Sequence, residues 1–287
     1  MEILFDDAAV APGDEAGVLA LYQAQGVATG IAGLEGVTEE RVAFFHEQGY
    51  LVVHDAFTPG EVEAALAGLL DLIDGKHPGF TKGIQFEAGA RALLPTLPRE
   101  RKQDVVRKLM RFVDYDPRLR AMAGHPRLLA ALERLIGEPP ALFQDQAMLK
   151  PPLIGREKPW HQDNAYFNLP PEATVVGVWI ALDEATPENG CMHIIPGSHR
   201  RGPVVHFKRR DWQICDTDVA TGQVVAVPLR PGGCLFFHGL LHHGTPPSRS
   251  PRRRRAVQFH YKPVSLGGIS AAERLAVFGS EGKDVTC

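Results

Sequence analysis

Hydrophobic residues recur at helical spacing in the first half of the chain. The segment "TEERVAFFHEQG" predicts a helix that ends at Gly49, and "YLVVHDAF" then predicts a short strand. "TPGEVEAALAGLLDLIDG" predicts a second helix, because Thr58 and Glu61 have capping-box spacing and Pro59 takes the first helical position. The stretch "DVVRKLMRFVDYDPRLRAMAGHPRLLAALERLIG" is predicted to be helical up to Gly137. We therefore expect the first half to be mostly helical.

The pattern changes after Pro140. Short segments rich in Val, Ile, Phe and Trp follow, separated by Gly, Pro and Asn clusters: "ALFQDQAMLK", "TVVGVWIALDEA", "GCMHIIPG", "QVVAVPLRPGGCLFFHG" and "RAVQFHYKP". Strands at this spacing, with no helices between them, predict an antiparallel sandwich or barrel. We expect residues 1–37 to form an N-terminal arm and residues 38–287 a single domain, whose helical half packs on a β core from about 140 to 265.

Composition and charge exclude several classes of protein. With 287 residues, 44% hydrophobic and 23% charged, the chain is an ordinary globular protein, and its net charge of -3 favours neither nucleic acid nor an anionic membrane as a partner. The acidic start does not resemble a signal peptide, and no apolar run approaches the roughly 18 residues that a membrane span needs. The scattered Cys191, Cys215, Cys234 and Cys287 argue against a zinc ribbon or a disulfide framework. We expect a cytoplasmic protein.

The segment "PWHQDNAYF" holds a candidate for metal chemistry. In an extended strand successive side chains alternate faces, so His161 and Asp163 would project together while Gln162 points away. An imidazole and a carboxylate are two of the three protein ligands of a facial non-haem iron site. An isolated H-x-D motif is more often a solvent-facing strand end, so a third ligand is needed to favour metal.

Candidates for the third ligand lie in "GGCLFFHGLLHHGTPP", which contains His238, His242 and His243. We favour His243, because Gly244 and a proline-rich turn place it at a strand end, as His161 is placed. Alternation should turn His242 away from the metal. In "PRRRRAVQFHY" the arginines precede a strand, so one or two of them could turn inward to pair with a carboxylate.

Four segments resemble one known family when they are taken in order: "WHQDNAYF", "GVWIALDEATPENGCMHIIPGSH", "GGCLFFHGLLHHGT" and "RRAVQFHY". They are similar to the phytanoyl-CoA dioxygenase family of iron(II)- and 2-oxoglutarate-dependent oxygenases, and the similarity spans roughly residues 38 to 265. The resemblance implies an α+β fold, with a double-stranded β-helix (a cupin-like jelly roll) flanked by N-terminal helices. It also implies a dioxygenase that uses Fe(II), 2-oxoglutarate and O₂ to hydroxylate a small molecule, releasing succinate and CO₂.

The resemblance also assigns roles to residues. It implies that His161, Asp163 and His243 bind the iron and that Arg254 grips the distal carboxylate of 2-oxoglutarate. Further co-substrate positions fall on Trp179, Gln146 and, after a one-residue shift in the predicted helix, Lys108. Halogenating relatives replace the aspartate by a small residue, so Asp163 favours hydroxylation, or a related oxidation at the same iron, over halogenation. His199 of "PGSH" is typical of the family, although a turn-capping or packing role is at least as plausible for it as a catalytic one.

Two other functions stay open at this point. One is a cupin-like metal enzyme that does not use 2-oxoglutarate, and the other is a non-catalytic binding protein of the same fold. The substrate is left open among acyl-CoA thioesters, compatible solutes and secondary metabolites, and so is the oligomeric state. Residues 75–103 are a candidate lid and residues 206–223 a second candidate substrate loop. The residues that could meet the substrate are Trp160, Asn164, Tyr166 and Phe167 beside the H-x-D, with Lys208, Arg209 and Arg210 as candidates for an anionic group.

Overall fold

The computed structural model describes residues 4–6, 15–80, 82–90 and 93–279 of the 287. Its helices are α1 (Glu15–Ala20), α2 (Glu39–Gln48), α3 (Pro59–Ile73), α4 (Pro117–Ala123), α5 (Pro126–Ile136) and α6 (Ala271–Phe278). Its strands are β1 (Leu4–Asp6), β2 (Gly26–Val27), β3 (Gly30–Ala32), β4 (Tyr50–His54), β5 (Ile84–Glu87), β6 (Val106–Met110), β7 (Pro140–Lys150), β8 (Lys158–His161), β9 (Val176–Ala181), β10 (Met192–Ile194), β11 (His206–Lys208), β12 (Trp212–Ile214), β13 (Val225–Val227), β14 (Cys234–His238), β15 (His243–Thr245) and β16 (Arg254–Pro263).

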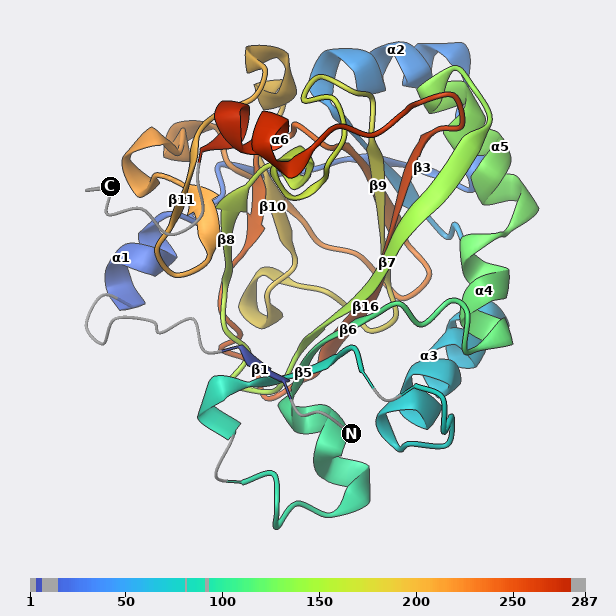
Figure 1. Ribbon diagram of the computed structural model, residues 1–287, viewed down its shortest axis with the longest axis vertical. Coiled ribbons are helices and arrows are strands. Elements are labelled where there is room, and N and C mark those ends of the chain that lie inside the picture. Colours follow the sequence, from blue (N-terminus) through green and yellow to red (C-terminus); the bar gives the residue numbers. More distant parts are fainter. Residues whose placement is uncertain (1–3, 7–14, 81, 91–92, 280–287) are drawn as a thin grey trace.

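Two sheets form the centre of the molecule (Figure 1). The larger sheet has the strand order β1-β5-β6-β7-β16-β9-β14-β4-β3, and the smaller one has the order β2-β13-β10-β15-β8. The central neighbours in both sheets are antiparallel. Strands that lie side by side come from distant parts of the chain, as in a jelly roll. The predicted jelly-roll core with flanking helices is confirmed.

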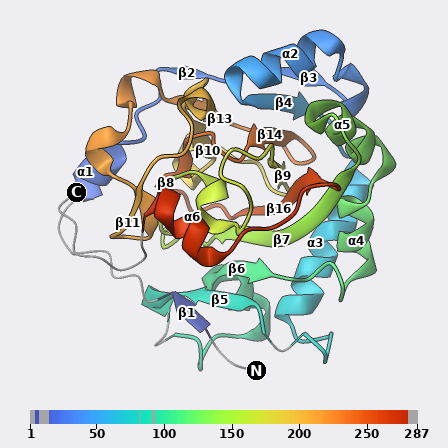
Figure 2. The same ribbon diagram turned by 45° about the horizontal axis from the view of Figure 1, so that its top comes forward.

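Alternation along the strands of the large sheet creates two apolar layers. On one face Val178, Phe236 and Phe259 pack with buried residues of helices α2 to α5, which cover this side of the sheet (Figure 2). On the other face Trp179 and Phe237 pack against strands of the smaller sheet. Each fully buried large apolar side chain stabilises the fold by roughly 1.5–3 kcal/mol, as an upper estimate. The chemical site lies within the inner layer.

Several elements follow from local sequence signals. Helix α2 ends at Gly49, whose φ of 79° suits glycine, and the side chains of Thr58 and Glu61 cap the start of α3 reciprocally. The long helix expected before Gly137 is wrong: Val106–Met110 is strand β6, and α4 and α5 each begin with a proline. A proline is compatible with the first helical turn only, so each proline starts a new helix.

The N-terminal segment adds strands to both sheets, since β2 pairs with β13 and β3 pairs with β4. The division into an arm and a domain stays a prediction. Cys191 and Cys234 are buried free thiols, whereas Cys215 is disulfide-bonded, which its spacing did not predict. In the part of the chain that the structure describes, no helix is long and apolar enough to cross a bilayer.

Candidate active site

Two neighbouring strand ends bring the predicted metal ligands together. Strand β8 ends at His161, a 3-10 turn begins at Asp163, and β15 begins at His243, which lies opposite His161 in the antiparallel register. One ligand atom from each residue lies within 4.8 Å of the others. Asp163 Oδ1 is 3.2 Å from His161 Nε2 and 3.6 Å from His243 Nε2. Gln162 points away, as alternation predicted, and its amide donates to the carbonyls of Gly202 and Leu240.

The backbone fixes how the two histidines present their nitrogen atoms. His161 Nδ1 lies 2.7 Å from the carbonyl of Pro159, and His243 Nδ1 lies 2.9 Å from the carbonyl of Leu241. A carbonyl only accepts hydrogen bonds, so in the neutral imidazoles Nδ1 carries the proton and the Nε2 lone pair faces Asp163. Two lone pairs that face a carboxylate repel it unless a cation lies between them. The donor set therefore fits a metal ion.

Burial sets the charges of this cluster. It lowers the pKa of His161 to about 4, an effect that His243 reinforces. Burial alone would raise the pKa of Asp163, but His243 and His260 hold it well below its usual range. At neutral pH the cluster thus offers a neutral imidazole and an ionised carboxylate. These are the protonation states that a divalent transition metal requires of its ligands.

The second oxygen of Asp163 is held by two residues that the sequence analysis did not single out. His260 Nε2 lies 2.7 Å from Asp163 Oδ2, and the amide of Gln258 donates to the same oxygen at 3.2 Å. Both come from β16, on the face of the strand that also carries Arg254. Alternation counted onward from Arg254 places both residues on its face of the strand, but it does not show that they contact Asp163. Asp163 can therefore direct Oδ1 to a metal while Oδ2 stays bound by the protein.

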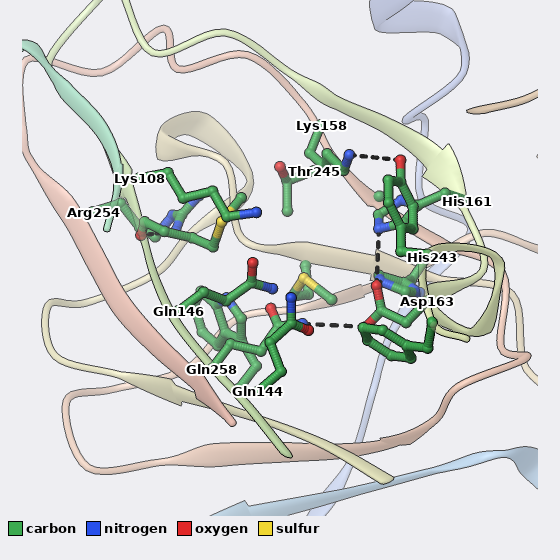
Figure 3. Close-up of a pocket in the computed structure, with 16 residues that line it drawn as sticks. Lys108, Gln144, Gln146, Lys158, His161, Asp163, His243, Thr245, Arg254 and Gln258 are labelled. Atoms are coloured by element: carbon green, nitrogen blue, oxygen red, sulfur yellow. Dashed lines mark hydrogen bonds and ion pairs between the residues drawn. The ribbon is translucent and has the colours of Figure 1, made fainter. Parts of the chain in front are cut away.

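All the predicted co-substrate residues line the same cavity as the three candidate ligands. This cavity of about 70 Å³ contacts Lys108, Gln146, Trp179 and Arg254 as well as the cluster. A cavity of this volume is too small for a large substrate. Figure 3 shows Arg254 and Lys108 at one side of the cavity and the cluster around Asp163 at the other.

Arg254 is buried without a counter-anion. Its Nη1 donates to the carbonyl of Met148 at 2.8 Å, and the guanidinium carbon lies 5.4 Å from the centre of the Trp179 ring. Its Nε has no hydrogen-bond partner, and no carboxylate pairs with it among the described residues. Burial lowers the pKa of Arg254 to about 10, so it is charged at neutral pH. A buried charge of this kind is expected to have an anionic ligand.

Two more polar groups in the cavity lack protein partners. The side chain of Lys108 forms no hydrogen bond or ion pair within the described ranges, and burial together with the charge of Lys158 lowers its pKa to about 8. Gln146 Oε1 is buried and unpaired. Lys158 differs, because its ammonium donates to Tyr166 at 2.9 Å and to Asp211 at 2.6 Å. The cavity thus holds two unpaired cations, in Lys108 and Arg254, which would match a doubly anionic ligand.

Three other histidines weighed from the sequence lie outside this cavity. His199 Nε2 is 3.0 Å from the carbonyl of His46, and its ring packs against His238 at 5.1 Å between centroids. This is a packing position, one of the two roles expected for His199. The backbone N–H of His242 donates to Ser198, and its side chain does not line the cavity, as alternation predicted.

The residues around the H-x-D motif divide into two groups. Tyr166 and Phe167 line the cavity, whereas Trp160 stacks on Tyr22 and the amide of Asn164 donates to nearby backbone carbonyls. Among the arginines of the second substrate loop, Arg210 forms ion pairs with both Glu157 and Asp216. The expectation that Arg210 is available for a substrate anion is therefore wrong.

A comparison with protein families identifies the family of the chain. The profile of the phytanoyl-CoA dioxygenase family matches residues 45–256, well over half of the chain. The chain belongs to this family. It is a non-haem oxygenase dependent on iron and 2-oxoglutarate, and the predicted enzyme class and cofactors are confirmed.

Individual relatives agree with this assignment. Phytanoyl-CoA dioxygenase domain-containing protein 1 of Danio rerio is 24% identical over 269 residues, which cover 79% of this chain and 90% of the relative. The non-haem α-ketoglutarate-dependent carbocyclase SnoK from nogalamycin biosynthesis superposes with a TM-score of 0.66 at 24% identity, over 89% of this chain and 98% of that one. EctD from S. alaskensis gives a TM-score of 0.68 at 23% identity, over 86% and 82% of the two chains. These two structures share the fold of the family member described here.

Proposed function

We propose that this oxygenase hydroxylates an unactivated C–H bond of a small molecule. One oxygen atom of O₂ would enter the substrate and the other would enter succinate, while the carboxylate next to the keto group of 2-oxoglutarate leaves as CO₂. The observation that carries the proposal is one cavity with the donors of a metal site at one side and the buried, unpaired Arg254 at the other.

We assign the metal to His161, Asp163 and His243. The two Nε2 lone pairs and Asp163 Oδ1 would supply three donors to the metal. Iron(II) held there would supply the activation of O₂. The role of the protein is to keep both histidines in one tautomer and Asp163 ionised and oriented.

We assign the distal carboxylate of 2-oxoglutarate to Arg254. Its free Nε and its position on the Trp179 ring support this role, because the ring fixes the plane of the guanidinium and excludes water on that side. Lys108 and Gln146 are assigned to the remaining polar atoms of the same ligand. Their unpaired donor and acceptor groups support this assignment.

Hydroxylation is favoured over halogenation and over a reaction that does not use 2-oxoglutarate. The presence of Asp163 argues against halogenation, since the carboxylate takes the coordination position that a halide would need. A metal enzyme that does not use 2-oxoglutarate would have no use for a buried arginine without a counter-anion. The cytoplasmic location and the absence of a nucleic-acid partner stay predictions from the composition.

The test is succinate release from 2-oxoglutarate in the presence of a metabolite extract. We expect wild type to release succinate and Arg254→Leu to need at least about tenfold more 2-oxoglutarate, the scale of one lost charged hydrogen bond. Arg253→Leu is the matched control, because the neighbouring Arg253 pairs with Asp104 outside the cavity. Unchanged co-substrate dependence in Arg254→Leu would refute the assignment of Arg254. Absence of turnover in wild type would favour a binding protein.

A further inference from the structure

A second, larger cleft adjoins the cavity. Its volume is about 990 Å³, within the range of sites for drug-sized ligands. Gln144, Tyr166 and Phe167 line both the cavity and the cleft. The Phe167 ring lies 4.9 Å from the ring of His260, and Tyr166 lies edge-on to His161 at 5.6 Å. A ligand in the cleft would therefore reach the residues that surround the candidate metal centre.

The walls of this cleft combine positive charge with aromatic surface. Lys82, Arg111 and Lys262 line it, together with Tyr115 and Phe143. Among the described residues, the lining has one carboxylate, that of Asp145, which accepts hydrogen bonds from the backbone N–H groups of residues 112 and 113. Three cationic side chains stand against this one carboxylate, so the lining has a net positive charge.

Arg111 has the most informative position in the cleft. Its φ of 61° lies in the left-handed region, which is costly for a residue with a Cβ atom. Asp145 fixes this turn, because its carbonyl and carboxylate accept the N–H groups of residues 111, 112 and 113. The exposed guanidinium of Arg111 forms no hydrogen bond or ion pair with any described residue. Strain of this kind persists where the surroundings enforce it, often at ligand sites.

We infer that the cleft binds the primary substrate, that this substrate is an organic anion with an apolar body, and that Arg111 recognises its anionic group. The inference rests on the proposed function, because it assigns the substrate of the same site. The apolar body would lie along Tyr115, Phe143 and Phe167, and its far end would meet the cavity at the side of the candidate metal ligands. The anionic group would stay at the cationic wall of the cleft.

A pair of dyes with the same aromatic framework tests the inference on the full chain. The anionic probe is 8-anilinonaphthalene-1-sulfonate, and the neutral one is N-phenyl-1-naphthylamine. We expect Arg111→Asn to lower the affinity for the sulfonate dye by about tenfold or more, the scale of a lost charged hydrogen bond. The affinity for the neutral dye should stay unchanged. Arg111→Lys should retain most of the affinity. Asn tolerates the left-handed backbone, so the melting temperature of Arg111→Asn should be preserved.

The control for net charge is Arg127→Asn, which removes an exposed cation on helix α5, outside the cleft. Equal affinity of Arg111→Asn and wild type for the sulfonate dye would overturn the inference, as would equal losses for both dyes. Displacement of the bound dye by decanoate would support a carboxylate as the anionic group of the substrate. Displacement by coenzyme A would support a phosphate. Failure of both would overturn the inference. The anaerobic binding of 2-oxoglutarate is measured separately, so a failure of the proposed function would be seen independently.

Discussion

Removal of the His260 side chain should weaken metal binding without removing a metal ligand. His260 is fully buried, and its Nε2 lies 2.7 Å from Asp163 Oδ2, whereas Gln258 approaches the same oxygen at 3.2 Å. In His260→Phe the ring volume is retained and the short hydrogen bond is lost. A hydrogen bond to a charged group contributes roughly 1.5–3 kcal/mol, which corresponds to a loss of about 10- to 100-fold in metal affinity.

The assay is anaerobic titration of the apoprotein with Co(II), followed by its visible absorption. His260→Gln is the matched control, because the amide nitrogen of Gln can reach about as far as Nε2 and should restore most of the affinity. Gln258→Leu should lower the Co(II) affinity less than His260→Phe does, because the hydrogen bond from Gln258 is longer. Co(II) affinity of a folded His260→Phe within about twofold of wild type would refute the view that the hydrogen bond from His260 orients Asp163.

Two further predictions concern stability. Burial lowers the pKa values of His206 and His238 to about 3, so the unfolded chain binds protons below pH 6.5 that the folded chain does not. The free energy of unfolding of the apoprotein should therefore fall by up to about 1.4 kcal/mol per pH unit for each histidine as the pH falls from 6.5 towards 3. Urea midpoints that stay constant from pH 7 to 4.5 would contradict this. Asp211→Asn removes the anion paired with Lys158 and should lower the free energy of unfolding by roughly 1–3 kcal/mol. We expect the lower end of this range, because the side chain of Asp211 is 27% exposed. A melting temperature equal to wild type would exclude a stabilising role for this pair.

Local signals in the sequence were sufficient for much of the fold. The glycine stop at Gly49 and the capping box at Thr58 act within one helical turn, so helices α2 and α3 appeared as predicted. Strand β6 was not predicted, because "VVRKLM" also continues a helical pattern. Its strand form depends on pairing with β5 and β7, which are distant in sequence. Pairing with distant strands therefore decided between helix and strand for this segment, which the periodicity of its sequence could not do.

The candidate site also contains residues whose role depends on tertiary structure and could not be predicted from local sequence. Alternation and the family resemblance found the residues that point inward at strand ends, which include His161 and Arg254. Gln258 and His260 were missed, because their role depends on where β16 lies relative to the turn at Asp163. The cleft around Arg111 could not be found from the sequence, because it is assembled from separate loops and strands.

The most direct test of the central claim is anaerobic addition of Fe(II) and then 2-oxoglutarate to the apoprotein, with visible absorption as the readout. We predict a weak charge-transfer band of the chelated keto acid in wild type, its loss in Asp163→Ala and its weakening in Arg254→Leu. If iron binds to wild type and no band forms at saturating 2-oxoglutarate, the co-substrate assignment is contradicted and a different metal-dependent reaction must be sought.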